Sequence, residues 1–432
     1  MSGGRIKQAT DTTEELGMKA ANRKKFKRSL LAACSVLAVS GGAGVTSATA
    51  EEAASSSIVK PIVDARLRYE HVDQDGFAND ADAVTARVRA GLETRPYKGF
   101  SVLLEAEIVE GFTEDYNSTT NGRGAFPVVA DPDNVELNRA QITYTGIDGV
   151  KFVGGRQRII LDDARFVGNV GWRQNEQTYD AALLEVTAIP DLKATYAYLS
   201  AVQRIFGNES PNGKFDAANS HIINLGYTGI PGISVGAYGY LFDLDEAPAL
   251  STQTYGVRAS AKYDITEGIP IIAKAAYAIQ SEYGDNPGNY DLDYYMASLG
   301  TKAYGFDASV TYEVLEGDST RGFSTPLATL HKFQGWADVF LATPANGIED
   351  LYGRVGYTSG KVGPFAKIIG AAIYHDFESE NGGGSLGSEV DLLLKGVLNK
   401  KLSLTAKYAN YDGPAGGPAD REKLSIQVDW KL

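Results

Sequence analysis

The stretch KLSIQVDWKL, residues 423–432, alternates between polar and apolar residues up to the end of the chain. Successive side chains of a β-strand point to opposite faces, so this pattern predicts a strand with one wet face and one apolar face. The wet face would carry Lys423, Ser425, Gln427, Asp429 and Lys431, and the apolar face Leu424, Ile426, Val428, Trp430 and Leu432. Such a strand is typical of a transmembrane β-barrel, which has a polar lumen and lipid on its outside.

The N-terminus carries the features of a secretion signal. A basic block between Arg23 and Arg28 precedes the apolar run SLLAACSVLAV (29–39), and Ala48-Thr49-Ala50 matches a cleavage site. We therefore assign residues 1–50 to a signal peptide, with Met18 as an alternative start because the basic block lies far from Met1. The segment 31–34 also resembles a lipoprotein box, but the apolar run continues past Cys34. Residues 51–61 then form a short periplasmic segment, and residues 62–432 form the barrel.

The composition of the chain excludes several classes of protein. Cys34 is the only cysteine, so the mature chain has neither a disulfide nor a thiolate for chemistry. The 54 Asp and Glu against 41 Lys and Arg give a net charge of −13, which argues against nucleic acid as a partner. The chain has no uninterrupted apolar stretch of about 20 residues, the length of a membrane-spanning helix. The 48 glycines, 24 tyrosines and 16 phenylalanines suit a barrel with turns and aromatic girdles, although a soluble β-sandwich could share these numbers.

The alternation seen at the C-terminus recurs along the chain. It is present over 63–70, 84–93, 100–108, 306–314 and 402–408, with apolar residues on one face of each segment. In the first three segments the other face carries charges, and an Arg or Lys on a lipid face at mid-bilayer costs about 2–4 kcal/mol. These charged faces must therefore line the lumen. A sandwich also has one buried and one wet face, but this many long strands behind a signal peptide favour an all-β, antiparallel transmembrane barrel.

Short and long connections between the predicted strands also alternate. Short periplasmic turns and long extracellular loops are the pattern of outer-membrane barrels. A first count gives 19 strands, which is not an even number, and the weakest candidate is the stretch Trp336–Leu341. Treating residues 316–348 as one long extracellular loop leaves 18 strands. The predicted short turns are Pro96–Gly99, Gly146–Gly149, Ile189–Asp191, Gly229–Gly232, Thr266–Pro270, Ala303–Gly305, Gly360–Gly363 and Asn399–Lys401, and the other long loops are 112–134, 159–175, 204–218, 284–290 and 379–388.

Four arginines and two carboxylates are predicted to share one patch of the lumen wall. If the turn between the second and third strands centres near Tyr97, Arg89 lies opposite Glu105 and Arg87 lies opposite Glu107. This patch has two interpretations: an ion-pair lattice that stiffens the barrel, or a charged constriction that orients and filters solutes. The candidate pore-lining residues are Arg66, Arg68, Arg87, Arg89, Glu105 and Glu107.

A second candidate site is the segment 155–181, which is rich in Arg, Asn, Gln and aromatic residues. It suits a loop that folds into the pore or binds a sugar, because arginine offers forked donors to carboxylates and tryptophan offers a flat ring. The alternative is an ordinary external loop held by the barrel and by lipopolysaccharide. Gly154-Gly155 indicates a bulge, which leaves open whether Arg156 or Gln157 points inward. The candidate solute-binding residues are Arg156, Arg158, Arg165, Trp172 and Arg173.

Several blocks of the chain resemble the alginate-export family of outer-membrane porins. They are DYNSTTNG (115–122), FPVVADPD (126–133), ELNRAQ (136–141), GRQRI (155–159), RFVGNVGWRQNEQTYDA (165–181) and ATLHKFQGWADVF (328–340). This resemblance implies an 18-stranded barrel whose arginine-rich pore passes an anionic polysaccharide. Two features depart from the family: the chain ends on Leu432 rather than on phenylalanine, and its net charge is strongly negative.

These observations predict a channel in the outer membrane of a Gram-negative cell for passive diffusion of small hydrophilic solutes, such as sugar acids or oligosaccharides. The alternatives are a general porin of low specificity and a non-conducting structural or adhesive barrel, although 18 strands without a plug leave an open lumen. We expect no enzyme, metal or other cofactor, because no spacing among the histidines specifies a metal site or a nucleophile. The four are His71, His221, His331 and His375. The expected partners are outer-membrane lipid, lipopolysaccharide, the assembly machinery that recognises the last strand, and the solutes.

Overall fold

The computed structural model describes residues 58–432, which contain 18 strands and two short 3-10 helices. The predicted signal peptide and most of the segment 51–61 lie outside the described residues. The strands are β1 Val59–Gln74, β2 Ala81–Thr94, β3 Phe100–Gly111, β4 Asn134–Ile147, β5 Val150–Gln157, β6 Thr178–Val186, β7 Leu192–Gln203, β8 Lys214–Ile230, β9 Ile233–Phe242, β10 Thr252–Thr266, β11 Ile269–Glu282, β12 Asp291–Ala303, β13 Phe306–Leu315, β14 Ile348–Thr358, β15 Lys367–Glu378, β16 Ser385–Val397, β17 Leu402–Asp412 and β18 Arg421–Lys431. The 3-10 helices are η1 Pro248–Leu250 and η2 Leu330–Lys332.

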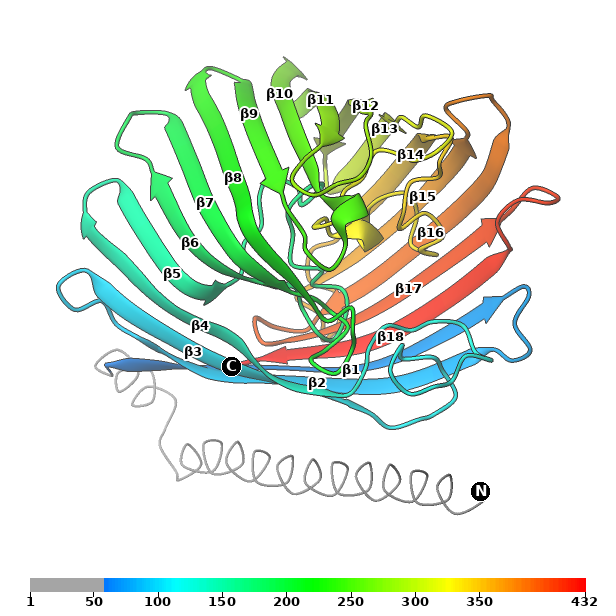
Figure 1. The fold of residues 1–432 in the computed structure, drawn as a ribbon, viewed down its shortest axis with the longest axis horizontal. Helices are drawn as coiled ribbons and strands as arrows, with labels where there is room; N and C mark the ends of the chain where they lie inside the picture. The colour runs from blue at the N-terminus through cyan, green and yellow to red at the C-terminus, as the bar shows by residue number, and fades with distance from the viewer. Residues whose placement is uncertain (1–57) are drawn as a thin grey trace, which may run out of the picture. The chain divides into compact units, whose positions relative to one another are not determined.

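The strands form one closed antiparallel barrel. Each strand pairs with the next in the chain, and β1 also pairs with β18, from Asp64 opposite Lys431 to Gln74 opposite Arg421. We call this pairing the closing seam. Figure 1 shows the strands in chain order around the ring, with blue β1 beside red β18. The predicted 18-stranded antiparallel barrel is therefore confirmed.

The connections alternate in length as predicted. Each of the eight predicted short turns overlaps a connection between two consecutive strands, although four of the ranges also include strand ends. The segment 316–347 contains only η2 and no strand, so Trp336–Leu341 belongs to a loop. Four of the long connections matter below: the β3–β4 loop (112–133), the β5–β6 loop (158–177), the β7–β8 loop (204–213) and the β13–β14 loop (316–347). No helix among residues 58–432 is long and apolar enough to cross a membrane.

The two faces of the barrel differ in polarity. On β18 the polar residues Lys423, Ser425 and Gln427 are buried, whereas Ile426 and Trp430 are exposed, which is the alternation that the C-terminal sequence predicts. Large apolar side chains are exposed on strands around the whole ring, including Leu104 of β3, Val257 of β10, Val355 of β14 and Leu394 of β16. An apolar outer band of this kind matches the lipid-facing surface of a membrane barrel.

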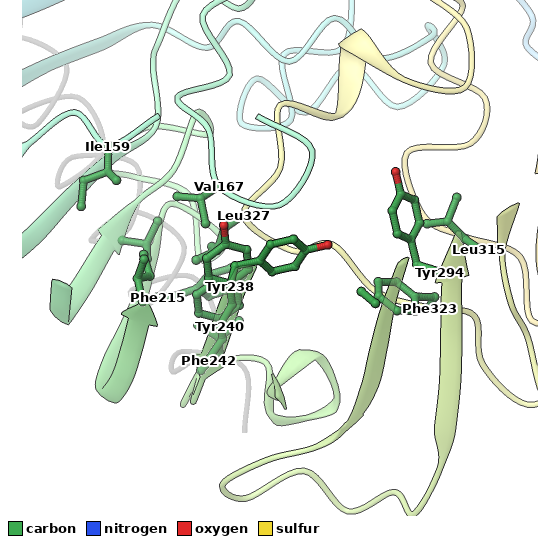
Figure 2. Packing of buried hydrophobic residues seen from close by; sticks show 14 of the residues in the cluster. Ile159, Val167, Phe215, Tyr238, Tyr240, Phe242, Tyr294, Leu315, Phe323 and Leu327 are labelled. Carbon is green, nitrogen blue, oxygen red and sulfur yellow. The ribbon is translucent and has the colours of Figure 1, made fainter. Parts of the chain in front are cut away.

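Part of the lumen is filled by packed side chains. Tyr238, Tyr240 and Phe242 alternate along β9 and stack on one another, with ring centroids 4.9 and 6.1 Å apart. Figure 2 shows these rings beside Val167 of the β5–β6 loop and Leu327 of the β13–β14 loop. Both loops therefore fold back into the barrel, where their apolar side chains join a hydrophobic cluster with the inner wall.

Candidate functional site in the barrel lumen

The six predicted pore-lining residues lie together on β1, β2 and β3, and they form ion pairs with their neighbours. We call them the wall patch. Three of the four arginines have a carboxylate partner on an adjacent strand, and Glu105 takes an arginine from β4. The pairs are Arg66–Asp429 at 2.8 Å, Arg87–Asp64, Arg89–Glu107 and Arg139–Glu105 at 2.7 Å. Arg68 has its carboxylate partners elsewhere: it lies 3.5 Å from Glu70 of its own strand and 3.6 Å from Asp131 of the β3–β4 loop. It also donates to Gln427 at 2.8 and 3.1 Å.

The predicted register between β2 and β3 is wrong by two residues. Arg89 lies opposite Glu107 rather than Glu105, and Arg87 lies opposite Val109. The turn is made by Lys98 and Gly99, with φ of 50° and 85°, the two-residue form with positive φ at both positions. Its centre lies later in the chain than Tyr97. A slip of two residues leaves every side chain on the same face, so the charges stay on the inside.

The β5–β6 loop folds into the barrel and covers the wall patch. The carbonyl of Trp172 accepts hydrogen bonds from Arg66 Nη1, at 2.9 Å, and from Arg68 Nη2. Arg68, Arg87, Arg89, Glu105 and Glu107 are each at most 6% exposed. These five side chains face the lumen, but the loop separates them from its open part, and only Arg66 of the wall patch is partly exposed.

Glu176 is the ionic anchor at the end of the β5–β6 loop. Its carboxylate accepts hydrogen bonds from Asn138 at 2.7 Å and from Arg158 Nε at 2.8 Å, and it lies 3.7 Å from Arg89. Burial would raise the pKa of Glu176, but Arg89 and Arg158 together with these hydrogen bonds lower it to about 2. The carboxylate therefore stays ionised, and Arg158 serves as its internal partner.

Arg173 joins three parts of the chain at one point. Its guanidinium lies 3.3 Å from Glu70 of β1, 3.7 Å from Asp131 of the β3–β4 loop and 3.2 Å from Asp338 of the β13–β14 loop. Asp338 also pairs with Lys423 of β18 at 2.6 Å. Since the side chains of the arginine and of all three carboxylates are at most 8% exposed, each depends on the others for compensation of its charge.

The ring of Trp172 is enclosed by charged and aromatic groups. Arg68 Cζ and Lys407 Nζ lie 4.0 and 4.2 Å from its centroid, and His331 stacks on it at 4.5 Å. Burial lowers the pKa of His331 to about 3, so its ring is neutral. Nδ1 then donates to Asp338 at 2.7 Å and Nε2 accepts from Lys407 Nζ at 2.7 Å. The Trp172 ring, which the sequence suggested as a stacking face for a sugar, is therefore already in contact with side chains of the protein.

The β13–β14 loop, expected to be extracellular, also bends into the barrel. The backbone N–H of Ala337 donates to Glu389 at 2.7 Å and that of Trp336 donates to Asp391 at 3.2 Å, both on β16. Arg421 of β18 donates to the carbonyl of Ala337 at 3.0 Å. The lumen is therefore narrowed by two loops that meet at Trp172, Arg173 and His331.

The other two predicted loop arginines have separate contacts. Arg165 is buried, and its Nε lies 2.9 Å from Glu313 of β13. Arg156 forms a forked pair with Asp180 across β5 and β6, at 2.7 and 3.0 Å. The register of β5 with both neighbours runs through Gly154 and Gly155 without a shift, so the predicted bulge is absent. Of the two residues left open by the sequence, Gln157 is the buried one.

A cavity of about 390 Å³ remains open between the β5–β6 loop and the wall formed by β8 to β12. Asp162 and Asp163 line it from the loop, and Arg258 and Lys274 line it from the wall. Arg258 pairs with Asp162. Lys274 is exposed, and no carboxylate among residues 58–432 lies within ion-pair distance of it. This cavity is the candidate functional site, because a mobile anion could reach its unpaired lysine.

Sequence reasoning missed Arg258 and Lys274, although a signal was present. Val257 of β10 and Tyr277 of β11 are exposed on the outer face, so strict alternation puts residues 258 and 274 on the inner face. Lys407 of β17 had the same signal, because the alternation over 402–408 puts it on the inner face. Asp131 and Asp338 had no such signal, because they lie in loops and act through contacts with a distant loop.

Comparison with solved structures finds barrels that overlay most of this chain. Acinetobacter baumannii OccAB2 is 17% identical, with a TM-score of 0.64 over 86% of this chain and 98% of its own. Acinetobacter baumannii OccAB4 is 12% identical, with a TM-score of 0.68 over 87% and 98%. Pseudomonas aeruginosa OccK11 is 15% identical, with a TM-score of 0.65 over 87% and 96%. No protein-family model and no curated protein matches the chain.

At these identities the likeness establishes the fold, which is the closed 18-stranded antiparallel barrel of outer-membrane porins. The coarser part of the resemblance deduced from the sequence is thus supported, but the alginate-export family itself is not. Most of the blocks that suggested that family lie in the β3–β4, β5–β6 and β13–β14 loops rather than in the strands.

Proposed function

We propose that this protein is an outer-membrane channel for passive diffusion of small hydrophilic solutes, with a preference for anions. The observation that carries the proposal is the open cavity beside the β5–β6 loop, where Lys274 is exposed without a carboxylate partner in residues 58–432. A closed barrel with an apolar outside and a charged inside provides the passage. The barrels of the same fold are porins, channels for small solutes that are often anionic.

Two groups of residues have different roles in this proposal. Arg258 and Lys274 face the solute across the cavity, opposite Asp162 and Asp163, so the charges of the wall and the loop set up a transverse field. The wall patch, with Glu176 and Arg173, holds the β5–β6 loop in place. The predicted solute-binding residues Arg158, Trp172 and Arg173 therefore act on transport indirectly, through the position of the loop.

A general porin of low specificity is the second candidate, and a non-conducting structural or adhesive barrel is the third. An enzyme within the barrel has little support, because the same-fold barrels are porins. Within residues 58–432 no histidine is hydrogen-bonded to a serine; His331 and His375 are instead bonded to Asp338 and Asp350. An anionic polysaccharide, the cargo implied by the alginate-export resemblance, is a narrower form of the proposal. Single-channel recordings with added oligouronates would test that cargo through length-dependent blockades.

The proposal includes the partners expected from the sequence. The apolar outer band would contact membrane lipid, the loop ends would contact lipopolysaccharide, and β18 would be recognised by the assembly machinery. The direct test of the function is the conductance of the purified protein in planar bilayers. Discrete current steps would support a channel. If the protein inserts into the bilayer without conducting, the channel is excluded and the structural or adhesive barrel remains as the hypothesis.

Ion selectivity should depend on the wall of the cavity. Replacing Lys274 by Gln, alone or with Arg258→Gln, should shift the reversal potential in a KCl gradient toward cations. Two unit charges about 8 Å apart in water interact by about 0.5 kcal/mol, which corresponds to roughly a twofold change in the anion-to-cation permeability ratio per charge. Lys361→Gln is the matched control, because Lys361 is exposed in the short connection between β14 and β15. If Lys274→Gln, the double variant and Lys361→Gln all have the same reversal potential, Lys274 does not lie on the conduction path.

Chemical labelling of intact cells should establish the orientation. The only natural cysteine, Cys34, lies in the predicted signal peptide, so single cysteines can be introduced without background. We expect a membrane-impermeant maleimide to modify a cysteine that replaces Thr320 or Ala415, both exposed in long loops, but not one that replaces Lys400 in a short turn. Labelling of the Lys400→Cys variant alone would show that the barrel is inserted the other way round.

A further inference from the structure

The short connections at one end of the barrel differ in charge from one side of the ring to the other. In residues 58–432 those between β14 and β3, counted through β18 and β1, carry no carboxylate, and their basic residues are Lys361, Lys400, Lys401, Arg95 and Lys98. Those between β4 and β13 carry neither lysine nor arginine, and their carboxylates are Asp148, Asp191 and Glu267. Figure 1 shows red β17 and β18 beside blue β1, so the basic connections are neighbours in the ring. We call them, together with Lys431 at the end of β18, the basic rim.

The central lysines of the basic rim are placed side by side by local hydrogen bonds. In the β16–β17 connection the side-chain oxygen of Asn399 accepts from the backbone N–H groups of Lys401 at 2.8 Å and of Leu402 at 3.0 Å. The backbone N–H of Lys431 donates to the carbonyl of Lys401 at 2.8 Å. Lys400, Lys401 and Lys431 are all exposed, so three ammonium groups reach solvent from one short stretch of the wall.

These lysines have little compensating charge within the protein. Lys431 Nζ lies 3.5 Å from Asp64. No carboxylate of the described barrel lies within ion-pair distance of Lys361, Lys400 or Lys401, although all three are exposed. Lysines of one sign that gather on one surface create a local positive potential, which attracts an anionic partner.

The basic rim borders directly on the lipid-facing surface. Trp430 and Leu432 flank Lys431 in the chain, and Tyr97 precedes Lys98; all three apolar side chains are exposed. Exposed aromatic residues of a membrane barrel mark the level where hydrocarbon meets the headgroups. A lysine one residue away can lay its apolar stem along lipid and keep its ammonium at the level of the phosphates.

We propose that the basic rim is a binding surface for anionic phospholipid headgroups, with Lys400, Lys401 and Lys431 at its centre. A lysine beside an anionic membrane surface favours binding by about fivefold. The acidic connections of the opposite side repel the same headgroups, so anionic lipids should gather along β14 to β3 only. The inference goes beyond the channel function, because this surface lies outside the wall and involves no solute.

The lengths of the connections favour a lipid over a polymer that lies beyond the membrane. The longest connection of the basic rim runs only from residue 359 to residue 366, and that between β16 and β17 only from 398 to 401. Turns of this length end near the headgroups and do not extend away from the bilayer. Under the proposed orientation they face the periplasm, at the end of the barrel opposite the loops that would contact lipopolysaccharide.

Trp430 provides a natural reporter for the lipids at this surface. The other two tryptophans, Trp172 and Trp336, lie inside the barrel against Lys407, so bromine atoms on lipid chains should quench Trp430 alone. The full-length protein is reconstituted in mixtures of phosphatidylglycerol and phosphatidylcholine in which one or the other lipid is brominated. We expect phosphatidylglycerol to be favoured beside Trp430 by about fivefold or more. The preference should disappear in about 1 M NaCl, where the screening length falls to about 3 Å.

Replacing Lys400, Lys401 and Lys431 together by Gln should remove the preference for phosphatidylglycerol, whereas replacing all three by Arg should keep it, because only the charge is required. The matched control is Lys151→Gln combined with Lys193→Gln. Both of these lysines are exposed at strand ends on the acidic side of the ring, so this variant should quench like the wild type. Heat-modifiable migration in gels confirms that each variant is folded before its fluorescence is measured.

The outcomes distinguish the lipid from other anions. Equal affinity for the two lipids in the wild type, or an unchanged preference in the Gln variant, would overturn the proposal. So would inorganic phosphate that abolishes the preference when NaCl of equal ionic strength does not, since this result would indicate a site for free phosphate. Sedimentation of the wild type with purified peptidoglycan, lost in the Gln variant and without any lipid preference, would assign the surface to the cell wall instead. Conductance in KCl is recorded separately, so a silent barrel with a lipid preference would contradict only the channel, and a conducting barrel without one would contradict only the lipid surface.

Discussion

Removing residues 161–174 and joining the ends with a short Gly-Ser linker should raise the single-channel conductance severalfold. The loop fills much of the lumen, and an 18-stranded barrel without an infolded loop encloses an open aqueous channel, so an increase of about threefold is expected. The deletion keeps Arg158 and Glu176, and with them the ion pair at the base of the loop. Planar-bilayer recording of purified, heat-modifiable protein gives the measurement.

The same deletion should also increase the preference for anions. Arg66 and Arg68 lose the carbonyl of Trp172 as an acceptor, and Arg68 loses the loop that buries it. Arg66 and Arg68, which the sequence suggested as pore-lining residues, would then face the open lumen. Deletion of residues 415–417 from the β17–β18 connection is the control, since these residues are exposed. Conductance equal to that of the control would mean that another segment sets the narrowest point.

Replacing Arg173 by Met should release both loops from the wall. The side chain is 7% exposed and faces Glu70, Asp131 and Asp338, and removing one partner of a buried ion pair costs about 3–5 kcal/mol because charges are left uncompensated. The strands keep their own hydrogen bonds, so the loss should be seen first as proteolytic cleavage within 316–347 and as flickering current. Arg123→Met, which breaks an exposed pair with Glu114, should cost about 0–1 kcal/mol.

The effect of Arg173→Met should depend on pH with a defined sign. In the wild type burial would raise the pKa of Asp338, but His331, Lys423 and Arg173 together hold it well below the usual value. Without Arg173 the buried carboxylate of Asp338 is destabilised while ionised, and taking up a proton relieves it. The penalty should therefore be largest at neutral pH and shrink as the pH falls. Adding Asp338→Asn should restore part of the loss at neutral pH, and cleavage patterns identical to Arg123→Met would contradict the role of Arg173.

The strands could be predicted because their signal is local. Alternation in 423–432 and in the segments 63–70 to 402–408 depends only on which face of a strand meets lipid, and the even strand count excluded a strand at Trp336–Leu341. The register of β2 against β3 could not be fixed to better than two residues. It depends on whether Lys98 and Gly99 both adopt positive φ, and Lys98 gives no sign of this in the sequence.

The lumen was predicted less completely, for a different physical reason. The arginines of the wall patch were found, but whether they face water or protein depends on the loop above them. The contacts that decide this join residues far apart in the chain: Arg173 and Asp338 are separated by 165 positions, and Arg66 and Trp172 by 106. Nothing local marks Asp338 as the partner of Arg173. Lys274 required only the alternation rule, and it was overlooked because its neighbours in the sequence, Ala273 and Ala275, carry no charge.

The two loops can dock completely in the lumen only after the closing seam has formed. Arg66 and Arg68 belong to the first strand, while Asp429, Gln427 and Lys423, which hold those arginines or Asp338, belong to the last. A barrel whose final strand has not yet been inserted would lack the contacts that Lys423 and Arg421 of β18 make with the β13–β14 loop. Its lumen would stay wide until the two ends of the chain met. The incompletely assembled barrel should therefore have a wider lumen than the finished one. Pairing of β1 with β18 closes the wall and also narrows the lumen, because it completes the surface on which the loops dock.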